Sequence, residues 1–292
     1  MEVKLEPGKY VVAVSGGVDS IVLFDVLNKL PDLELVLAHF DHGMRKDSAE
    51  DRKFAEQLAK NYDVLFEYAE GKLGAKTSEA DARQARYNFL YKVRERYQAL
   101  GIVTAHHQDD LLETAILNWL RGTNRKGLSS LQSTDIIKRP LLHIPKKELL
   151  AYAQTHNLVW REDPSNQDEK YLRNYVRRQI VSRLTPDERT KLLDIIKQAT
   201  ISNRAIDLGI KQVLGTEERL DRQWFIKLSH SVAKEVMAAW LRQHEVRNLD
   251  RHNLERLVIA AKTYSSVKQT DIDKTYNLKV SSKYLALEPR DR

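Results

Sequence analysis

The amino-acid sequence predicts a doubly wound α/β fold with a mainly parallel sheet, followed by a smaller C-terminal α+β domain. Three observations support this fold class. Short apolar runs alternate with helix-like segments from Tyr10 to about Asn157, and a glycine-rich turn follows the first apolar run. After Thr185 the pattern becomes helical and ends in two strand-like runs. Alternating strands and helices are typical of βαβ units, whose strands lie parallel in one sheet.

The elements follow one another in a regular order. Apolar, β-branched runs predict strands at Val11–Val14, Leu35–His39, Val64–Tyr68, Ile102–Ala105 and near Ile136–Ile137. Helical periodicity predicts helices at Val18–Leu30, Ser48–Tyr62, Glu79–Leu100, Asp110–Leu120, Lys146–Asn157, Val232–His244 and Asp250–Ala261. We expect a first domain at 1–185, a helical connector at 186–215 and a small domain at 216–292 with a hairpin at Tyr276–Lys279 and Tyr284–Leu287.

Composition narrows the class of protein. A chain of 292 residues can hold one large domain and a small one. It contains no cysteine, which excludes disulfides, cysteine-bound clusters and thiolate nucleophiles and fits a cytoplasmic protein. The net charge of +7 favours a nucleic-acid partner. No stretch approaches the roughly 18 apolar residues of a membrane span, so we expect no membrane partner.

The glycine-rich turn reads SGGVDS and lies between a strand and a helix. Its two glycines let backbone N–H groups approach an anion, and the helix N-terminus adds partial positive charge. The turn lacks the Gly-Lys-Ser/Thr ending of a Walker loop, which argues against γ-phosphate transfer. The alternative is a tight turn in which Ser15 or Asp19 caps the helix. The candidate phosphate-binding residues are Ser15, Gly16, Gly17, Val18, Asp19 and Ser20.

A second polar segment, TAHHQDDLLE, extends from Thr104 to Glu113 at the end of the fourth predicted strand. Asp110 and Glu113 are three residues apart and lie on one face of the first helical turn. A capping box is one alternative, and a metal-dependent phosphoesterase site is another. We favour a functional site because ligands of doubly wound sheets bind at the carboxyl ends of strands. The phosphoesterase alternative would use Asp41, His42, His106, His107, Asp109 and Asp110.

Basic side chains occur in three places. Arg83 and Arg86 share a helix face and would bind phosphates if a nucleotide lies nearby; otherwise they are solvated. A glycine-flanked loop carries Arg121, Arg125 and Lys126, and a basic helix with tyrosines follows the turn at Glu162–Asn166. Interleaved arginines and aromatic residues suit phosphates and unstacked RNA bases, whereas the alternative is an ordinary amphipathic helix. Trp224 and Trp240 are interpreted as core residues.

In this order, SGGVDS, HFDHGMR, EADARQARY, TAHHQDDLLET, WLRG, RPLL, EDPSN and RNYVR resemble the tRNA(Ile)-lysidine synthase family. That family belongs to the PP-loop ATP pyrophosphatases, which have an adenine nucleotide α-hydrolase-like fold. The resemblance implies that ATP adenylates C2 of the wobble cytidine in an isoleucine tRNA with a CAU anticodon, releasing pyrophosphate. The ε-amine of free L-lysine then replaces AMP and forms lysidine, which changes decoding from AUG to AUA.

The resemblance also implies roles for residues. The SGGVDS loop binds ATP with Mg²⁺, which Asp19 or Asp41 would contact, while Asp110 and Glu113 hold lysine. We expect His106 or Asp110 to accept the proton of the amine. The expected catalytic set is His106, Asp110, Arg83, Arg86 and Asp41, and the expected tRNA-binding set is Arg45, Arg121, Arg125, Lys126, Arg173, Asn174 and Arg177.

Other functions stay open from the sequence. The tRNA thiolases of the superfamily need cysteines, and the GMP, NAD and asparagine synthetase-like members lack the HHQDD and RNYVR segments in this arrangement. The phosphoesterase described above and an RNA-binding module without chemistry are the remaining alternatives. A homodimer is compatible with the sequence. The C-terminal hairpin lacks the glycines of the family's usual version.

Overall fold

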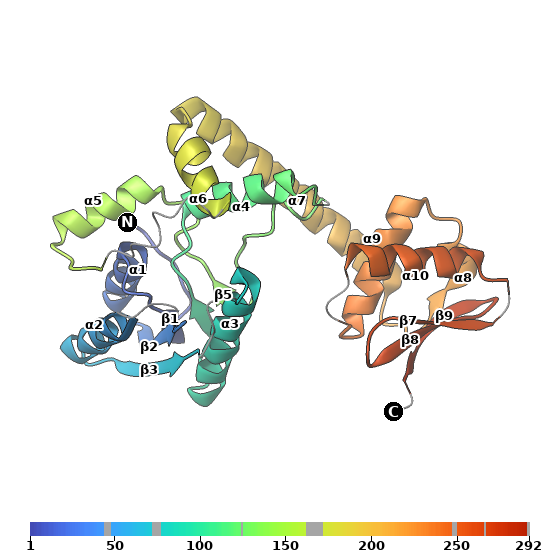
Figure 1. Cartoon of the computed structure of the whole chain (residues 1–292), viewed down its shortest axis with the longest axis horizontal. Coiled ribbons are helices and arrows are strands. Elements are labelled where there is room, and N and C mark those ends of the chain that lie inside the picture. The colour runs from blue at the N-terminus through green and yellow to red at the C-terminus, as the bar shows by residue number, and fades with distance from the viewer. Residues whose placement is uncertain are drawn as a thin grey trace. The chain divides into compact units, whose positions relative to one another are not determined.

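The computed structural model describes residues 1–43, 48–71, 77–123, 125–161, 172–246, 250–265 and 267–290. The chain divides into two compact units, Met1–Thr200 and Ile201–Arg292 (Figure 1). The boundary falls inside a long helix, α7, at Pro186–Leu214. We describe each unit by itself.

The first unit is built on a parallel sheet of five strands in the order β3-β2-β1-β4-β5. Its elements are β1 Gly8–Ala13, α1 Val18–Asn28, β2 Leu33–Asp41, α2 Ser48–Asn61, β3 Leu65–Glu70, α3 Glu79–Arg96, β4 Gly101–Val103, α4 Gln108–Leu120, β5 Ile137–Lys138 and α5 Lys146–Thr155. Each neighbouring pair of strands is parallel, with Tyr10 opposite both Leu35 and Gly101. The predicted doubly wound sheet is therefore confirmed.

Both faces of the sheet are covered, and the central strands contain uninterrupted apolar runs at 10–13 in β1 and 35–38 in β2. Val12 of β1 is fully buried against α1, α2 and α5 on one face. Val11, the next residue, points to the opposite face and is buried against α3. Successive side chains of a strand alternate between faces, so an uninterrupted apolar run requires helices on both.

The strand order places a topological switch point between β1 and β4. The chain leaves β1 towards β2 on one side, and β4 pairs with the other side of β1. The turns at the carboxyl ends of these two strands contain the SGGVDS loop and the His106–Glu113 segment. Neighbouring parallel strands bring these turns to the same sheet edge, where doubly wound proteins bind their ligands.

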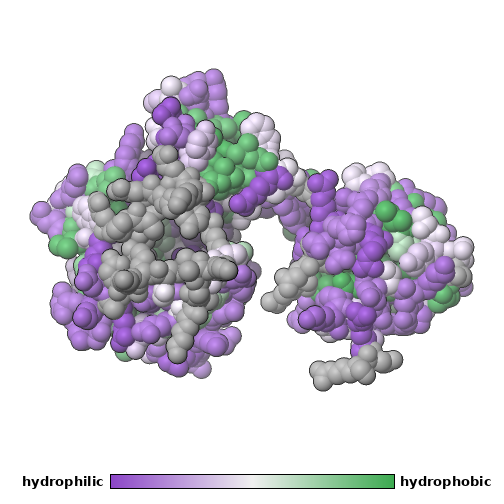
Figure 2. All heavy atoms as spheres, in the orientation of Figure 1, coloured by the Kyte–Doolittle hydropathy of each residue, from purple (hydrophilic) through white to green (hydrophobic). Residues whose placement is uncertain are grey.

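A helical part completes the first unit: α6 Leu172–Tyr175, a π-helical turn η2 at Val176–Ile180, a 3₁₀ turn η3 at Val181–Arg183, and the first half of α7. These elements pack against α4 around Leu112, Val176 and Ile196. Figure 2 shows apolar side chains gathered over α4 and α7, and the exposed apolar residues of these two helices include Trp119, Leu120 and Ile195.

The second unit packs helices on an antiparallel sheet in the order β6-β9-β8-β7. Its core surrounds Trp240, which is 1% exposed, so its interpretation as a core residue is confirmed; Trp224 packs at the edge of this core. The predicted hairpin is β8–β9, whereas β6 and β7 are short additions that apolar patterning does not indicate. The elements are β6 Leu220–Asp221, α8 Arg222–Phe225, α9 His230–Gln243, α10 Arg251–Thr263, β7 Lys268–Asp271, β8 Tyr276–Val280 and β9 Tyr284–Pro289.

No helix in the described part of the chain combines the length and the apolar character needed to cross a membrane.

Candidate active site

The SGGVDS loop is held in shape by its own hydroxyl groups. The Ser20 Oγ donates to the Gly17 carbonyl oxygen at 2.8 Å and accepts from the Ser15 backbone N–H at 3.2 Å. Gly16 has a φ of +90°, a backbone conformation that other L-residues rarely adopt. From outside the loop, the Arg161 backbone N–H donates to the Gly16 carbonyl oxygen at 3.0 Å.

The start of α1 has no side-chain cap. Its N-cap is Gly17, whose own N–H donates to the Ser15 Oγ at 3.4 Å. No side chain in the described chain caps the first helical turn, whereas Ser78 caps α3 and Asp250 caps α10. The alternative reading of Ser15 or Asp19 as a helix cap is therefore wrong. The first N–H groups of a helix lack partners within it, so an uncapped start is suited to an anion.

Asp19 joins the loop to two other helix starts. Its Oδ1 lies 2.5 Å from the Lys146 Nζ at the beginning of α5, and its Oδ2 lies 3.6 Å from the His107 Nε2 at the beginning of α4. Burial disfavours the charged carboxylate, but His107 and Lys146 outweigh it and lower the pKa of Asp19. The loop, α4 and α5 therefore form one site.

The first turn of α4 is capped by its own side chains. His107 is the N-cap; its Nδ1 accepts from the Asp109 N–H at 3.2 Å, and its backbone N–H donates to the Asp110 Oδ2 at 3.0 Å. The capping box is thus His107 with Asp110, not Asp110 with Glu113. Capping uses the Oδ2 of Asp110, whereas its Oδ1 has only a long contact of 3.5 Å with Arg177.

Glu113 and Asp110 share a cation that the sequence analysis assigned to tRNA. The Arg177 Nε and Nη2 donate to the Glu113 carboxylate at 2.6 and 3.0 Å, and Nη2 lies 3.5 Å from the Asp110 Oδ1. Glu113 is 1% exposed. Burial raises the pKa of Glu113, although Arg177 acts in the opposite direction. Burial also disfavours the charge of Arg177, but the Glu113 carboxylate outweighs it and holds the pKa of Arg177 above its ordinary value. Arg177 therefore lies between the two carboxylates expected to hold lysine.

We expect Arg177→Ala to lower the free energy of unfolding by about 2 kcal/mol, because it leaves the buried Glu113 charge without its partner. Adding Glu113→Gln should restore part of this loss, which a double-variant cycle in urea measures. Lys191→Ala is the control, since the Lys191–Asp187 pair is 72% and 74% exposed and its loss should change stability by less than about 0.5 kcal/mol. Additive losses from Arg177 and Glu113 would contradict the pairing.

A group of arginines surrounds the buried side chain of Tyr87. The guanidinium carbons of Arg83 and Arg86 lie 4.9 and 5.6 Å from the centre of its ring. The Arg139 Nη2 donates to its hydroxyl at 3.4 Å. Within the described ranges, no carboxylate forms an ion pair with Arg83 or Arg86. Burial lowers the pKa of Arg86, and neighbouring Arg83 and Arg173 lower it further. Clustered cations without carboxylates form a site for an anion.

His106 faces this cationic group. Its Nδ1 lies 2.9 Å from the Thr104 Oγ1. Burial, followed by the charges of Arg139 and Arg86, places the pKa of His106 well below its ordinary value. The imidazole is therefore neutral at pH 7, and the same burial and arginine charges that keep it neutral make it a weak base.

We expect this neutral histidine to make stability dependent on pH. Below pH 6.5 the unfolded chain protonates His106 while the folded chain does not, so stability falls as pH falls, by up to about 1.4 kcal/mol per pH unit. Between pH 6.5 and 5, the free energy of unfolding of the wild type should therefore fall more than that of His106→Gln. Urea unfolding of both proteins at each pH measures this difference. His39 and His42 also have lowered pKa values from burial, but they are present in both proteins. A difference that is constant from pH 7.5 to 5 would contradict the assignment.

Asp41 and His42 lie at the carboxyl end of β2. The Asp41 Oδ1 accepts from the Gly43 N–H at 2.7 Å, as in a polar turn. The His42 Nδ1 is buried without a hydrogen-bond partner in the described chain. No three His, Asp or Glu side chains of the described ranges are grouped to hold a metal ion. The structure does not assemble the metal site that the phosphoesterase alternative requires, and the catalytic role of Asp41 stays a prediction.

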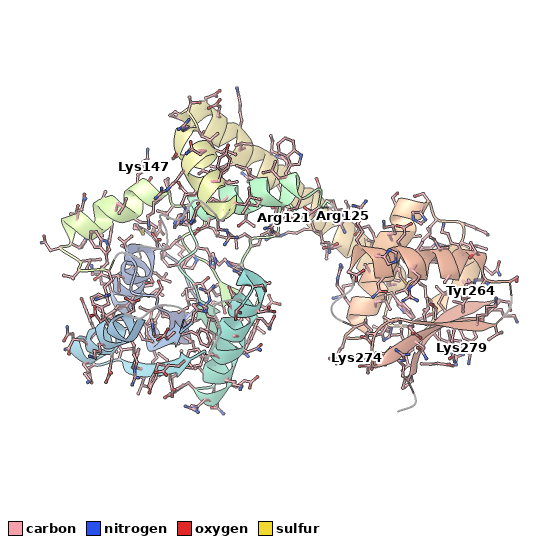
Figure 3. All side chains as sticks on the ribbon, in the orientation of Figure 1. Arg121, Arg125, Lys147, Tyr264, Lys274 and Lys279 are labelled. Atoms are coloured by element: carbon pink, nitrogen blue, oxygen red, sulfur yellow. The ribbon has the colours of Figure 1, made fainter. Side chains whose placement is uncertain are left out.

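The other tRNA-binding candidates are dispersed. Figure 3 labels Arg121 and Arg125 in the loop that follows α4. Asn118 anchors this loop, because its Nδ2 donates to the Gly127 carbonyl oxygen at 2.9 Å. Arg121 is exposed, whereas Lys126 and Arg173 are partly buried and Asn174 is buried. Arg45 and the turn at 162–166 lie outside the described residues.

Three residues of the site were not predicted as site residues from the sequence. Arg139 contacts Tyr87, Arg189 forms a two-bond ion pair with Asp109 at 2.9 and 3.1 Å, and Lys146 contacts Asp19. Arg139 and Lys146 had a signal in the sequence. Arg139 begins the RPLL segment, and Lys146 follows Pro145 at a helix start, where acidic residues are favoured and a lysine needs a compensating carboxylate.

The fold and the site define a doubly wound α/β protein with a glycine-rich loop at an uncapped helix start, beside an acidic helix start. The chain belongs to the PP-loop family, whose PP-loop domain matches residues 2–184. A tRNA(Ile)-lysidine synthase from Thermotoga maritima is 37% identical over 188 residues. One from Nitrosomonas europaea is 31% identical over 280 residues, 88% of this chain. The resemblance to tRNA(Ile)-lysidine synthases is thereby confirmed.

The match to these relatives is partial in length. The match to the Thermotoga protein covers 61% of this chain and 45% of that protein. The match to the Nitrosomonas protein covers 60% of that protein. Among solved structures, the U34-tRNA thiolase NcsA from Methanococcus maripaludis with its [4Fe-4S] cluster has a TM-score of 0.54 and 19% identity, covering 67% of this chain and 73% of that one. The latter likeness concerns the fold alone.

Proposed function

We propose that this chain catalyses the two-step conversion of the wobble cytidine of a CAU-anticodon isoleucine tRNA to lysidine. The main observation in support is that Asp19 links the uncapped loop to the start of α4, where Asp110 and Glu113 lie. A nucleotide bound at the loop and an amine bound at the acidic helix start would thereby be adjacent. The names of the curated relatives support the same reaction.

In the first step, the C2 oxygen of cytidine attacks the α-phosphorus of ATP, and the bond to the bridging oxygen of pyrophosphate breaks. The loop N–H groups at α1 would bind phosphate oxygens, and Arg83 and Arg86 would offset negative charge near the adenylate. Asp19, a carboxylate that is 30% exposed beside the loop, would contact the Mg²⁺ that accompanies the ATP phosphates. When bound, the ion would neutralise phosphate charge.

In the second step, the lysine ε-amine attacks C2 and AMP departs with the C2–O electron pair. Only about one in 2,500 such amines is unprotonated at pH 7, so binding must be coupled to proton removal. The Asp110 Oδ1 would bind the ammonium in place of its long 3.5 Å contact with Arg177. Asp110 or His106 would accept the proton, and we favour Asp110 because the pKa of His106 lies well below its ordinary value. Glu113 differs from our initial expectation in already holding Arg177 by two hydrogen bonds, so we assign direct lysine contact mainly to Asp110.

The RNA partner would contact basic residues near this site. Arg121 is exposed in the loop after α4, and Trp119, two residues earlier, is 73% exposed. An exposed indole beside arginine suits an unstacked base next to a phosphate.

The test follows both products in one assay with the full chain, CAU-anticodon isoleucine tRNA, ATP and labelled lysine. We expect tRNA-dependent exchange of pyrophosphate into ATP, followed by label in the tRNA. ADP and inorganic phosphate as products would overturn the proposal. Exchange without lysine incorporation would indicate another adenylating enzyme, and phosphoester hydrolysis without ATP would indicate the phosphoesterase.

A further inference from the structure

Lys146 brings a positive charge to a loop that has none of its own. Residues Val14 to Val22 include no lysine or arginine. The structure supplies one from 127 residues further along the chain, because the Lys146 Nζ lies 2.5 Å from the Asp19 Oδ1. Asp19 is the second residue of α1, so this ammonium lies at the uncapped helix start.

The backbone of Lys146 is fixed on the other side by α4. Its N–H donates to the Asp109 Oδ1 at 3.2 Å, and two hydrogen bonds from Arg189 hold the same carboxylate. The Gln108 N–H also donates to the Ile144 carbonyl oxygen at 3.0 Å. These contacts with α4 fix the backbone of Lys146 at the start of α5, and its side chain is 33% exposed.

We propose that Lys146 is a pyrophosphate-binding residue for the reaction proposed above. Its ammonium would bind oxygens of the β- and γ-phosphates of ATP. As the α-phosphorus bond breaks, the electron pair passes to the bridging oxygen of the departing pyrophosphate, and the nearby ammonium stabilises that charge without giving up a proton. A Walker loop carries such a lysine within the loop itself, whereas here the start of α5 provides it.

A purely structural role predicts something different. If Lys146 only neutralises Asp19, its removal should weaken the affinity for all nucleotides alike or change only the stability of the protein. If it binds pyrophosphate, its removal should affect ligands that carry the β- and γ-phosphates and spare AMP, which lacks them.

The experiment measures the affinity of the full chain for inorganic pyrophosphate, ATP and AMP by calorimetry. We expect Lys146→Ala and Lys146→Gln to weaken the affinity for pyrophosphate and ATP by about tenfold to a hundredfold. The affinity for AMP should fall by less than about twofold. Lys146→Gln can still donate to Asp19, so it keeps the test valid if the alanine variant does not fold. Lys147→Ala is the matched control: Lys147 is the next residue on α5, exposed and labelled in Figure 3, and its loss should leave all three affinities unchanged.

Equal weakening of AMP and pyrophosphate, or no weakening of pyrophosphate, would overturn this inference. Its failure is separable from that of the proposed function. Wild-type lysidine formation together with unchanged pyrophosphate affinity in Lys146→Gln would refute the inference alone. Selective loss of pyrophosphate binding in a chain whose wild type makes no lysidine would support the inference and refute the proposed function.

Discussion

A chain carrying Asp110→Asn should release pyrophosphate at close to the wild-type rate and incorporate lysine at least about a hundredfold more slowly. Asparagine keeps an oxygen for the His107 N–H, so the start of α4 should remain capped. It loses the negative charge that would hold the ammonium and the basicity that would accept its proton. Single-turnover assays that follow pyrophosphate and labelled lysine together measure the two rates.

Asp109→Asn is the matched control for this variant. Asp109 is the adjacent carboxylate on α4, but it pairs with Arg189 and the Lys146 N–H. We expect lower stability and an unchanged ratio of lysine incorporated to pyrophosphate released. Loss of both steps in Asp110→Asn would show that the division of labour between the loop and α4 is wrong.

Replacing Arg86 by methionine should slow adenylation by about a hundredfold to a thousandfold while leaving the protein at least as stable. Arg86 is surrounded by arginines and has no carboxylate partner in the described chain, so burying its charge has a free-energy cost. Replacement of a buried charge by an apolar side chain of similar size is commonly neutral or stabilising. The measurements are pyrophosphate release and the midpoint of thermal unfolding.

The control for Arg86→Met lies on the same helix. Arg96 forms an ion pair with Glu67 at 2.8 Å and is 67% exposed, so Arg96→Met should leave adenylation unchanged. A fall in both activity and stability of Arg86→Met would instead indicate that Arg86 supports the packing around Tyr87.

The parallel sheet was predictable because its strands are continuous apolar runs, and the loop because its glycines interrupt such a run. Their placement at one sheet edge followed from the strand-end rule. The short strands β6 and β7 were not predictable, since KQTD in β7 is polar and two residues in β6 carry no periodicity. Such strands form only because β8 and β9 provide ladder partners.

The partners of the site residues were less predictable than the residues themselves. Asp110 and Glu113 stand out by their spacing, but nothing local indicates that Arg177, 64 residues after Glu113, would pair with them. Likewise, Arg189 gave no signal for its bonds to Asp109. These pairings depend on how α4, η2 and α7 pack, which is a long-range property of the chain.

The SGGVDS loop depends on contacts with distant parts of the first unit, so it should not keep its conformation in another protein. Its carbonyl at Gly16 is held by Arg161, its carboxylate by Lys146, and the strand before it by the His39 Nδ1, which lies 2.9 Å from the Val14 carbonyl oxygen. The hexapeptide grafted into a foreign scaffold, or a fragment ending before Arg161, would lack these supports. The conformation of this loop is therefore a collective property of the first unit.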